Sequence, residues 1–178
     1  VIELEDYVAW ACWLKSQPYV QGDRIGVEGF SFGGTTTAML VLRYPQYFCC
    51  GVAGGGVYDW TLYDSHYTER FMDTPQANPE GYAEAGVLTW VPKVFSPVKS
   101  IFPAPGALKL THGTGDDNVH FQNTLQLVDA LQKEGYQFEL MIYPDGMHGY
   151  RGKQHLHDQA SDHIFWTRHL LGKPAAEQ

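Results

Sequence analysis

A serine flanked by glycines, Gly29-Phe-Ser-Phe-Gly33, is the stretch of this chain with the most evident chemistry. An apolar run at residues 24–29 precedes it, and a helical pattern at residues 34–43 follows it. A strand, a sharp turn and a helix around Gly-x-Ser-x-Gly form the elbow that holds a nucleophilic serine. Ser31 is therefore the candidate nucleophile, and the backbone N–H of Phe32 is a candidate oxyanion donor. Cβ atoms at Gly29 and Gly33 are expected to collide with neighbouring backbone.

The partners of Ser31 decide the chemistry, because the pentapeptide alone is also compatible with an ordinary loop. A serine hydroxyl needs a base that removes its proton and a carboxylate that orients the base. Two later loops supply these groups, Gly115-Asp-Asp-Asn-Val119 and Pro144-Asp-Gly-Met-His-Gly149. The order serine, acid, histidine is the one that this elbow requires. His148 is the predicted base.

The choice of acid lies between neighbouring aspartates. Asp116 is preferred because it opens an Asp-x-x-Val loop, in which such an acid is commonly found. Asp117 then fits a helix cap or a solvated loop carboxylate. Asp145 is less suitable, since it stands too close to His148 in the sequence to come from a separate strand.

The other histidines fit packing or solvated helix faces better than catalysis. A zinc site made of His155, His157 and His163 is disfavoured, because the first two are spaced i,i+2 and would not share a helix face. Neither a metal nor another cofactor is expected.

Strands and helices alternate along the chain. Apolar runs predict strands at residues 24–29, 50–54, 107–112 and 138–143, and helical patterns predict helices at residues 1–14, 34–43, 118–134 and about 155–171. This order indicates an α/β fold with a mostly parallel sheet and flanking helices. Ser31 and the two later loops then share the carboxyl edge of the sheet. Residues 58–106 are expected to form loops and short helices that carry binding residues, with Asn78 capping a helix before Pro79.

Composition narrows the class of protein. The 178 residues suit one domain, and the formal charge of −8 argues against nucleic acid. No run reaches the roughly 18 apolar residues of a membrane span. Cys12, Cys49 and Cys50 are read as buried small apolar residues. The first residues look like a helix already under way, with no signal peptide, so an upstream part is expected to be missing.

Three stretches carry a family resemblance: Gly29-Phe-Ser-Phe-Gly-Gly34, Tyr63-Asp-Ser-His-Tyr-Thr-Glu-Arg70 and His112-Gly-Thr-Gly-Asp-Asp-Asn-Val-His-Phe-Gln122. With them the chain resembles the C-terminal catalytic domain of the prolyl oligopeptidase class of serine peptidases, closest to the dipeptidyl peptidase IV branch. The resemblance implies an α/β-hydrolase fold of which residues 1–178 form only the C-terminal half. The upstream hydrolase strands and a β-propeller are then absent.

The resemblance also assigns residues. It implies a triad of Ser31, Asp116 and His148, in agreement with the spacing argument. It implies that the side-chain amide of Asn118 contacts a substrate carbonyl. It further implies an aromatic pocket for a proline ring, with Phe32 beside it, made of Val57, Trp60, Tyr63, Tyr67 and Val119.

The activity implied by the resemblance is release of an N-terminal Xaa-Pro dipeptide through an acyl-enzyme on Ser31. Residues 53–60 and 74–81 also resemble bacterial prolyl tripeptidyl peptidases, which leaves tripeptide release open. The absent parts would supply the second oxyanion donor and the glutamates that bind the substrate's amino terminus. The isolated chain is therefore expected to be weak or inactive and to self-associate, while the parent protein is expected to be exported. Phe30 and Phe32 replace a tryptophan and a tyrosine, which predicts altered pocket polarity.

Two other functions remain compatible with the residues. A carboxylesterase-type hydrolase would use the same triad and prefer small esters to prolyl peptides. A non-catalytic binding module would keep the fold and would not react with a fluorophosphonate probe.

Overall fold

A four-stranded parallel sheet organises the computed structural model, which describes residues 2–95 and 106–172. The strands lie side by side in the order of the sequence: β1 (Gly26–Phe30), β2 (Cys50–Gly54), β3 (Ala107–Gly113) and β4 (Glu139–Tyr143). All three neighbouring pairs are parallel. The predicted α/β fold with a parallel sheet is confirmed.

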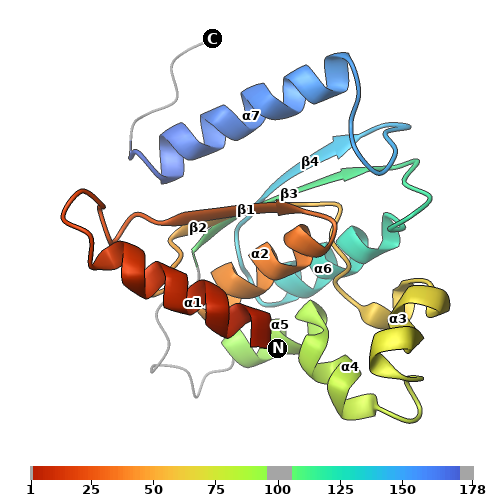
Figure 1. Cartoon of the computed structure of the whole chain (residues 1–178). Helices are drawn as coiled ribbons and strands as arrows, with labels where there is room; N and C mark the ends of the chain where they lie inside the picture. The colour runs from red at the N-terminus through yellow and green to blue at the C-terminus, as the bar shows by residue number, and fades with distance from the viewer. Residues whose placement is uncertain (1, 96–105, 173–178) are drawn as a thin grey trace.

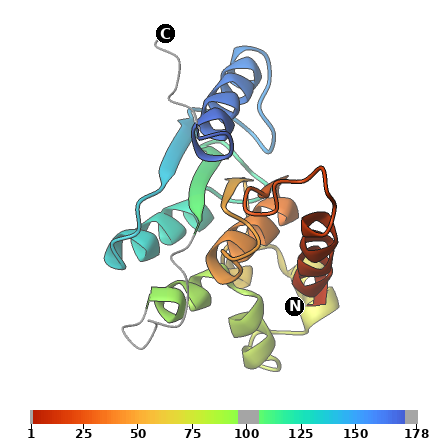
Figure 2. The same ribbon diagram turned by 90° about the vertical axis from the view of Figure 1, so that its left-hand side faces the viewer.

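Helices cover both faces of the sheet. One face carries α7 (Lys153–His169), and the other carries α2 (Phe32–Arg43), α5 (Val87–Phe95) and α6 (Gln122–Lys133). The view in Figure 2 separates these layers, with α1 (Ile2–Lys15) beside α2 on the side of the sheet opposite α7. The core between the sheet and the α2 layer is apolar, and Leu40, Leu108, Leu110 and Leu127 are almost fully buried in it. Burial of each such side chain contributes about 1.5–3 kcal/mol of stabilising free energy, which holds the layers together.

The excursion between β2 and β3 contains short helices, as predicted. They are η1 (Trp60–Leu62), α3 (Ser65–Met72) and α4 (Pro79–Ala85), followed by α5. Asn78 caps α4, since its side chain accepts a hydrogen bond from the N–H of Gly81 and Pro79 occupies the first helical position. In Figure 1, α3 lies below the carboxyl ends of the strands. Residues 96–105 of the expected excursion lie outside the described residues.

Two helices begin at other residues than predicted, because their positions depend on the turns that precede them. The helix after the serine begins at Phe32 rather than residue 34, directly after Ser31. The helix expected from residue 118 begins at Gln122. Its first predicted residues stay in a loop because the N–H groups of Asn118 and Val119 donate to Oδ1 of Asp116.

The prediction that all three cysteines are buried is wrong. Cys50 is buried in β2, Cys49 is half-buried, and Cys12 is exposed on α1. The apolar residues of α1 do not gather on one face, since Leu4 and Ala11 are buried whereas Trp10 and Trp13 are exposed. Within residues 2–95 and 106–172, no helix has the length and apolar character needed to cross a membrane.

Candidate active site

Ser31 occupies a strained turn between β1 and α2. Its backbone has φ 60° and ψ −122°, outside the regions that a serine prefers. The turn is held because the N–H of Ser31 donates to the carbonyl of Gly54 at 2.8 Å. A serine at such a turn projects its hydroxyl beyond the carboxyl ends of the strands.

The glycines around Ser31 differ in whether the structure leaves room for a Cβ atom. A Cβ on Gly29 would lie 2.4 Å from the carbonyl oxygen of Gly33, so the predicted collision is confirmed there. The same prediction is wrong for Gly33, which faces open space. Gly34 has the second close approach instead, with a Cβ expected 2.4 Å from the carbonyl oxygen of Gly54. Helix α2 therefore approaches β2 through Gly34.

Ser31, His148 and Asp116 form a continuous hydrogen-bonded chain. Nε2 of His148 lies 2.9 Å from Oγ of Ser31, and Nδ1 of His148 lies 2.7 Å from Oδ2 of Asp116. Asp116 is buried, whereas the His148 side chain keeps 20% of its surface exposed. This geometry suits proton transfer from the serine hydroxyl to the imidazole.

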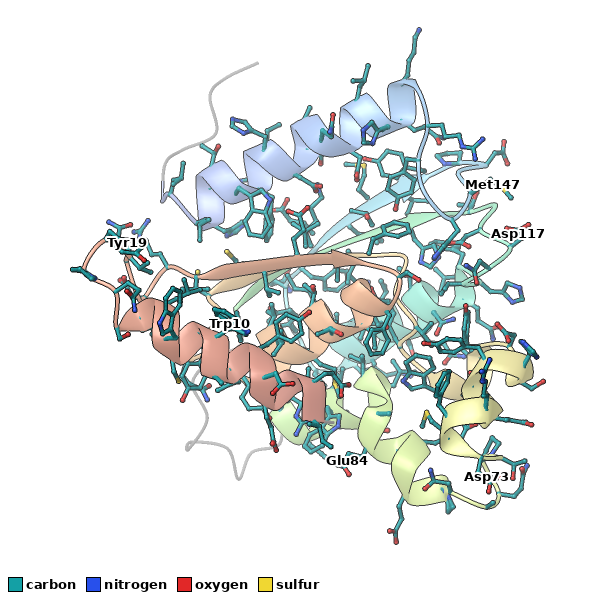
Figure 3. All side chains as sticks on the ribbon, in the orientation of Figure 1. Trp10, Tyr19, Asp73, Glu84, Asp117 and Met147 are labelled. Carbon is teal, nitrogen blue, oxygen red and sulfur yellow. The ribbon has the colours of Figure 1, made fainter. Side chains whose placement is uncertain are left out.

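The loops after β3 and β4 are bonded to each other, which brings Asp116 and His148 together. The N–H of Gly115 donates to the carbonyl of Gly146, and the N–H of Asp145 donates to Oγ1 of Thr114. A Cβ on Gly113 would lie 2.1 Å from the oxygen of Gly146, so only glycine permits this approach. Figure 3 shows Asp117 and Met147, one from each loop, beyond the tips of these strands.

The two alternative acids occupy other positions. Asp145 sits in the tight turn after β4 with φ 56°, and Asp117 lines an outer surface depression with Asp145 and Met147. The carboxylate within hydrogen-bonding distance of His148 is Asp116. Among the described residues, histidine, cysteine and carboxylate side chains form no group of three that could hold a metal ion.

His112 is a site residue that the sequence analysis assigned to packing. It is fully buried at the end of β3, with Nε2 2.8 Å from the carbonyl of Val119 and 3.3 Å from Oδ2 of Asp116. Nδ1 lies 2.6 Å from the hydroxyl of Thr124. Burial lowers the pKa of His112, which favours a neutral ring that donates through Nε2.

Phe32 is the first residue of α2, so its N–H is one of the helix's free N-terminal donors. The positive end of the helix macrodipole adds to the attraction for a developing negative charge beside Ser31.

The residues predicted to form the proline pocket contact one another, and Phe32, the residue after Ser31, contacts them through Trp60. Val57, Trp60 and Val119 are buried in one cluster, with Tyr63 packed against it. Trp60 contacts Tyr63 edge to face at 6.1 Å between ring centroids, and Tyr63 contacts Tyr67 at 5.7 Å. Phe32 lies 6.0 Å from Trp60. Phe32, Trp60, Tyr63 and Tyr67 thus form a continuous aromatic wall that begins at the residue after Ser31.

Tyr63 links this wall to the acid loop. Its hydroxyl donates to Oδ1 of Asn118 at 2.8 Å, and burial raises its pKa, so the phenol keeps its proton. The amide nitrogen of Asn118 then remains to donate elsewhere. Tyr82, which sequence reasoning missed, completes the buried cluster and hydrogen-bonds the carbonyl of Asp73.

Several known proteins are similar to this chain in sequence and in fold. A "Probable dipeptidyl-aminopeptidase B" of Grosmannia clavigera is 39% identical over 164 residues, which cover 89% of this chain and 16% of that protein. A crystal structure of Porphyromonas gingivalis dipeptidyl peptidase 4 has a TM-score of 0.80 and 37% identity, covering 93% of this chain and 22% of that one. A Bacteroides ovatus structure, assigned as a dipeptidyl aminopeptidase IV, has a TM-score of 0.83 and 38% identity over 96% of this chain and 22% of that one.

These matches cover most of this chain but only a small part of each relative, because the chain spans about a sixth of the length of the curated relatives it matches. The family model of the prolyl oligopeptidases matches residues 1–174, nearly the whole chain. The fold is that of the α/β-hydrolases, and the chain belongs to the prolyl oligopeptidase family.

Proposed function

We propose that this chain is the catalytic part of a serine exopeptidase that cleaves after proline. The observation that carries the proposal is the hydrogen-bonded chain from Oγ of Ser31 through His148 to Asp116, with distances of 2.9 and 2.7 Å. Ser31 is the nucleophile, His148 the general base and Asp116 the residue that orients the imidazole.

The reaction follows from these roles. Nε2 of His148 takes the hydroxyl proton as Oγ of Ser31 attacks the scissile carbonyl carbon. The N–H of Phe32 donates to the resulting oxyanion. His148 gives the proton to the amide nitrogen, the C–N bond breaks, and the amine leaves an acyl ester on Ser31. Water then attacks the ester with His148 as base, which releases the carboxylic acid and restores Ser31.

The proline specificity is proposed from the aromatic wall. A pyrrolidine ring is flat-sided and apolar, and an N-substituted proline carries no N–H that the pocket would leave unpaired. The proposed pocket consists of Val57, Trp60, Tyr63, Tyr67 and Val119. Asn118, with Oδ1 bonded to Tyr63, would donate its amide N–H to a substrate carbonyl. The names of the similar proteins support release of a dipeptide. The alternative is release of a tripeptide with proline in its third position.

A longer protein is proposed to complete the site. By the resemblance, residues outside this chain would supply the second oxyanion donor and the carboxylates that bind the substrate's amino terminus. Loss of one oxyanion donor costs about 10²–10³ in rate. The 178-residue chain alone should therefore turn over prolyl peptides slowly.

Hydrolysis of p-nitroanilides tests the proposal. The purified chain and its Ser31→Ala variant are assayed with Gly-Pro, Gly-Gly and Ala-Ala-Pro anilides and with p-nitrophenyl acetate. We expect slow hydrolysis of a prolyl anilide in preference to the Gly-Gly anilide, lost in Ser31→Ala. Faster turnover of the ester with no prolyl preference would support the esterase instead. A prolyl rate near that of full-length relatives would contradict the incomplete site.

The isolated chain is also proposed to self-associate. Strand β1 lies at the edge of the sheet, and the exposed side chains of Trp10 and Trp13 stand on α1, at 63% and 50% of their surface. Sedimentation velocity across a wide concentration range should give a rising average mass. A single monomeric species throughout would contradict self-association.

A further inference from the structure

Phe30 lies against the ring of His148. The two ring centroids are 5.1 Å apart with an interplanar angle of 56°. Phe30 is itself seated on the end of β2, since a Cβ on Gly54 would lie 2.6 Å and one on Gly55 2.8 Å from its ring. The imidazole therefore has a fixed apolar neighbour in addition to its hydrogen bonds to Ser31 and Asp116.

Tyr150 holds Phe30 from the other side. Its ring meets Phe30 edge to face, with centroids 5.8 Å apart and an interplanar angle of 87°. The hydroxyl of Tyr150 donates to Oγ1 of Thr111 in β3 at 3.0 Å, and Thr111 is buried. Burial raises the pKa of Tyr150, so the phenol remains a donor over the working pH range.

Tyr150 also anchors the loop that carries His148. Only Gly149, with φ 113°, separates the two residues, and Tyr143 at the end of β4 lies against the Tyr150 ring with a centroid distance of 4.2 Å. The backbone beside His148 is thus fixed to two strands through one side chain. A base that must stay within hydrogen-bonding distance of Ser31 benefits from such support, because small displacements slow reactions strongly.

We infer that Tyr150, through Phe30 and its hydrogen bond to Thr111, is a positioning residue for His148. The inference rests on the proposed role of His148 as base. It assigns Tyr150 no contact with substrate. It predicts that changes at Tyr150 reduce the reactivity of Ser31 without reducing substrate affinity.

The test measures the second-order rate constant for labelling of the full 178-residue chain by a fluorophosphonate probe, as a function of pH. The variants are Tyr150→Phe, Thr111→Val, their double mutant and Tyr150→Leu, with urea denaturation of each. Tyr143→Phe is the matched control, since it keeps the ring that lies against Tyr150 and removes only a hydroxyl that is hydrogen-bonded to His157.

We expect Tyr150→Phe and Thr111→Val each to lower the plateau of the pH–rate profile about 3–10-fold, and the double mutant to be no slower than either. Tyr150→Leu should lower it about 10–100-fold. With p-nitrophenyl acetate, kcat should fall while KM stays unchanged. Tyr143→Phe should lower the urea midpoint and leave the rate within twofold.

Two results would overturn the inference while leaving the triad intact. One is Ser31 labelling in Tyr150→Phe and Thr111→Val at the wild-type rate. The other is an equal loss of rate in Tyr143→Phe, which would indicate general destabilisation. Absence of Ser31 labelling in the wild-type chain would overturn this inference and the proposed function together. If Tyr150→Leu fails to fold, the hydroxyl variants still decide the question.

Discussion

Asp116 is the most heavily bonded side chain of the proposed site. Oδ1 accepts hydrogen bonds from the N–H groups of Asn118 and Val119, while Oδ2 faces His148 and His112. Both carboxylate oxygens are thus fixed before any substrate binds. A carboxylate held in this way selects the tautomer in which Nδ1 of His148 carries the proton and Nε2 faces Ser31.

Replacing Asp116 with asparagine should therefore remove reactivity while keeping the shape of the site. We predict a fall of about 10⁴-fold in the rate of the acylation step, since an amide stabilises the wrong tautomer. Asp145→Asn is the matched control and should stay within about threefold of the wild type. Fluorophosphonate labelling kinetics would measure both, and equal losses in the two variants would contradict the choice of Asp116.

His112 predicts a pH dependence of stability. Its pKa is lowered in the folded state by burial, whereas the unfolded value is about 6.5. The unfolded chain therefore binds more protons below pH 6.5. The contribution of neutral His112 to the free energy of unfolding is fully present above that pH. It is lost as pH falls from about 6.5 toward the lowered pKa of the folded state.

The variant His112→Gln isolates this contribution. Urea unfolding between pH 5 and 8 should show a smaller loss of stability on acidification than in the wild type, because glutamine does not titrate there. The change His120→Gln, outside this buried group, serves as the control. An identical pH slope in the wild type and His112→Gln would show that His112 is not the group responsible.

Among the individual residues, the sequence predicted those whose order along the chain is typical of a catalytic triad. Ser31, Asp116 and His148 were selected from loop positions and motif order, and they lie within hydrogen-bonding distance in the structure. The place of His112 beside Asp116 was missed, because a histidine inside an apolar run looks like a packing residue until the loop after it is folded back.

At the scale of elements, the junction of β1, α2 and β2 sets the position of Ser31. Helix α2 begins immediately at Phe32 and crosses β2 so closely that Gly34 contacts the backbone of Gly54. The motif predicted that Gly29 and Gly33 must be glycine. In the structure, a Cβ atom would collide with backbone at Gly29 and Gly34 instead. A pentapeptide motif does not report which neighbouring strand lies behind it.

The pair Gly34→Ala and Gly33→Ala tests this junction. A Cβ at Gly34 must displace strand backbone, so we predict destabilisation of about 1–3 kcal/mol and loss of reactivity at Ser31. Gly33 is helical and unobstructed, so alanine there should be neutral or stabilising by up to about 1 kcal/mol. Urea unfolding checks both, and equal effects would contradict the close approach at Gly34.

Helix α7 is fixed to the sheet by a buried charge. Nζ of Lys109 in β3 is almost fully buried and lies 2.7 Å from Oδ1 of Asp162 and 2.6 Å from Oγ of Ser161. The alternation of strands and helices predicted a helix here, but a lysine inside an apolar strand gave no indication of its partner.

Removal of Asp162 should leave the buried amine of Lys109 without its hydrogen-bonded carboxylate, with Asp158 as the other acidic group that interacts with it. We predict that Asp162→Ala lowers the free energy of unfolding by about 3–5 kcal/mol. The exposed pair Asp129 and Lys133 offers a control, and Asp129→Ala should change it by less than about 1 kcal/mol. Chemical denaturation measures both, and similar small effects would argue that α7 is held by its apolar contacts alone.

At the scale of the whole molecule, the strand order explains why distant segments meet. Four parallel strands in sequence order bring the loops after β1, β3 and β4 to one edge, which is where Ser31, Asp116 and His148 lie. Alternating strands and helices were sufficient to predict this. The exposed faces of α1 were not predictable in detail, because they depend on which surfaces meet within the chain.

The role of Ser31 as the nucleophile is tested by the site of covalent modification by a fluorophosphonate probe. Mass spectrometry of the digested wild-type chain should place one adduct on Ser31, and Ser31→Ala should remain unlabelled although it folds with an unchanged urea midpoint. Labelling of Ser31→Ala at the wild-type rate, or a wild-type adduct on another residue, would contradict the assignment of Ser31 as the nucleophile.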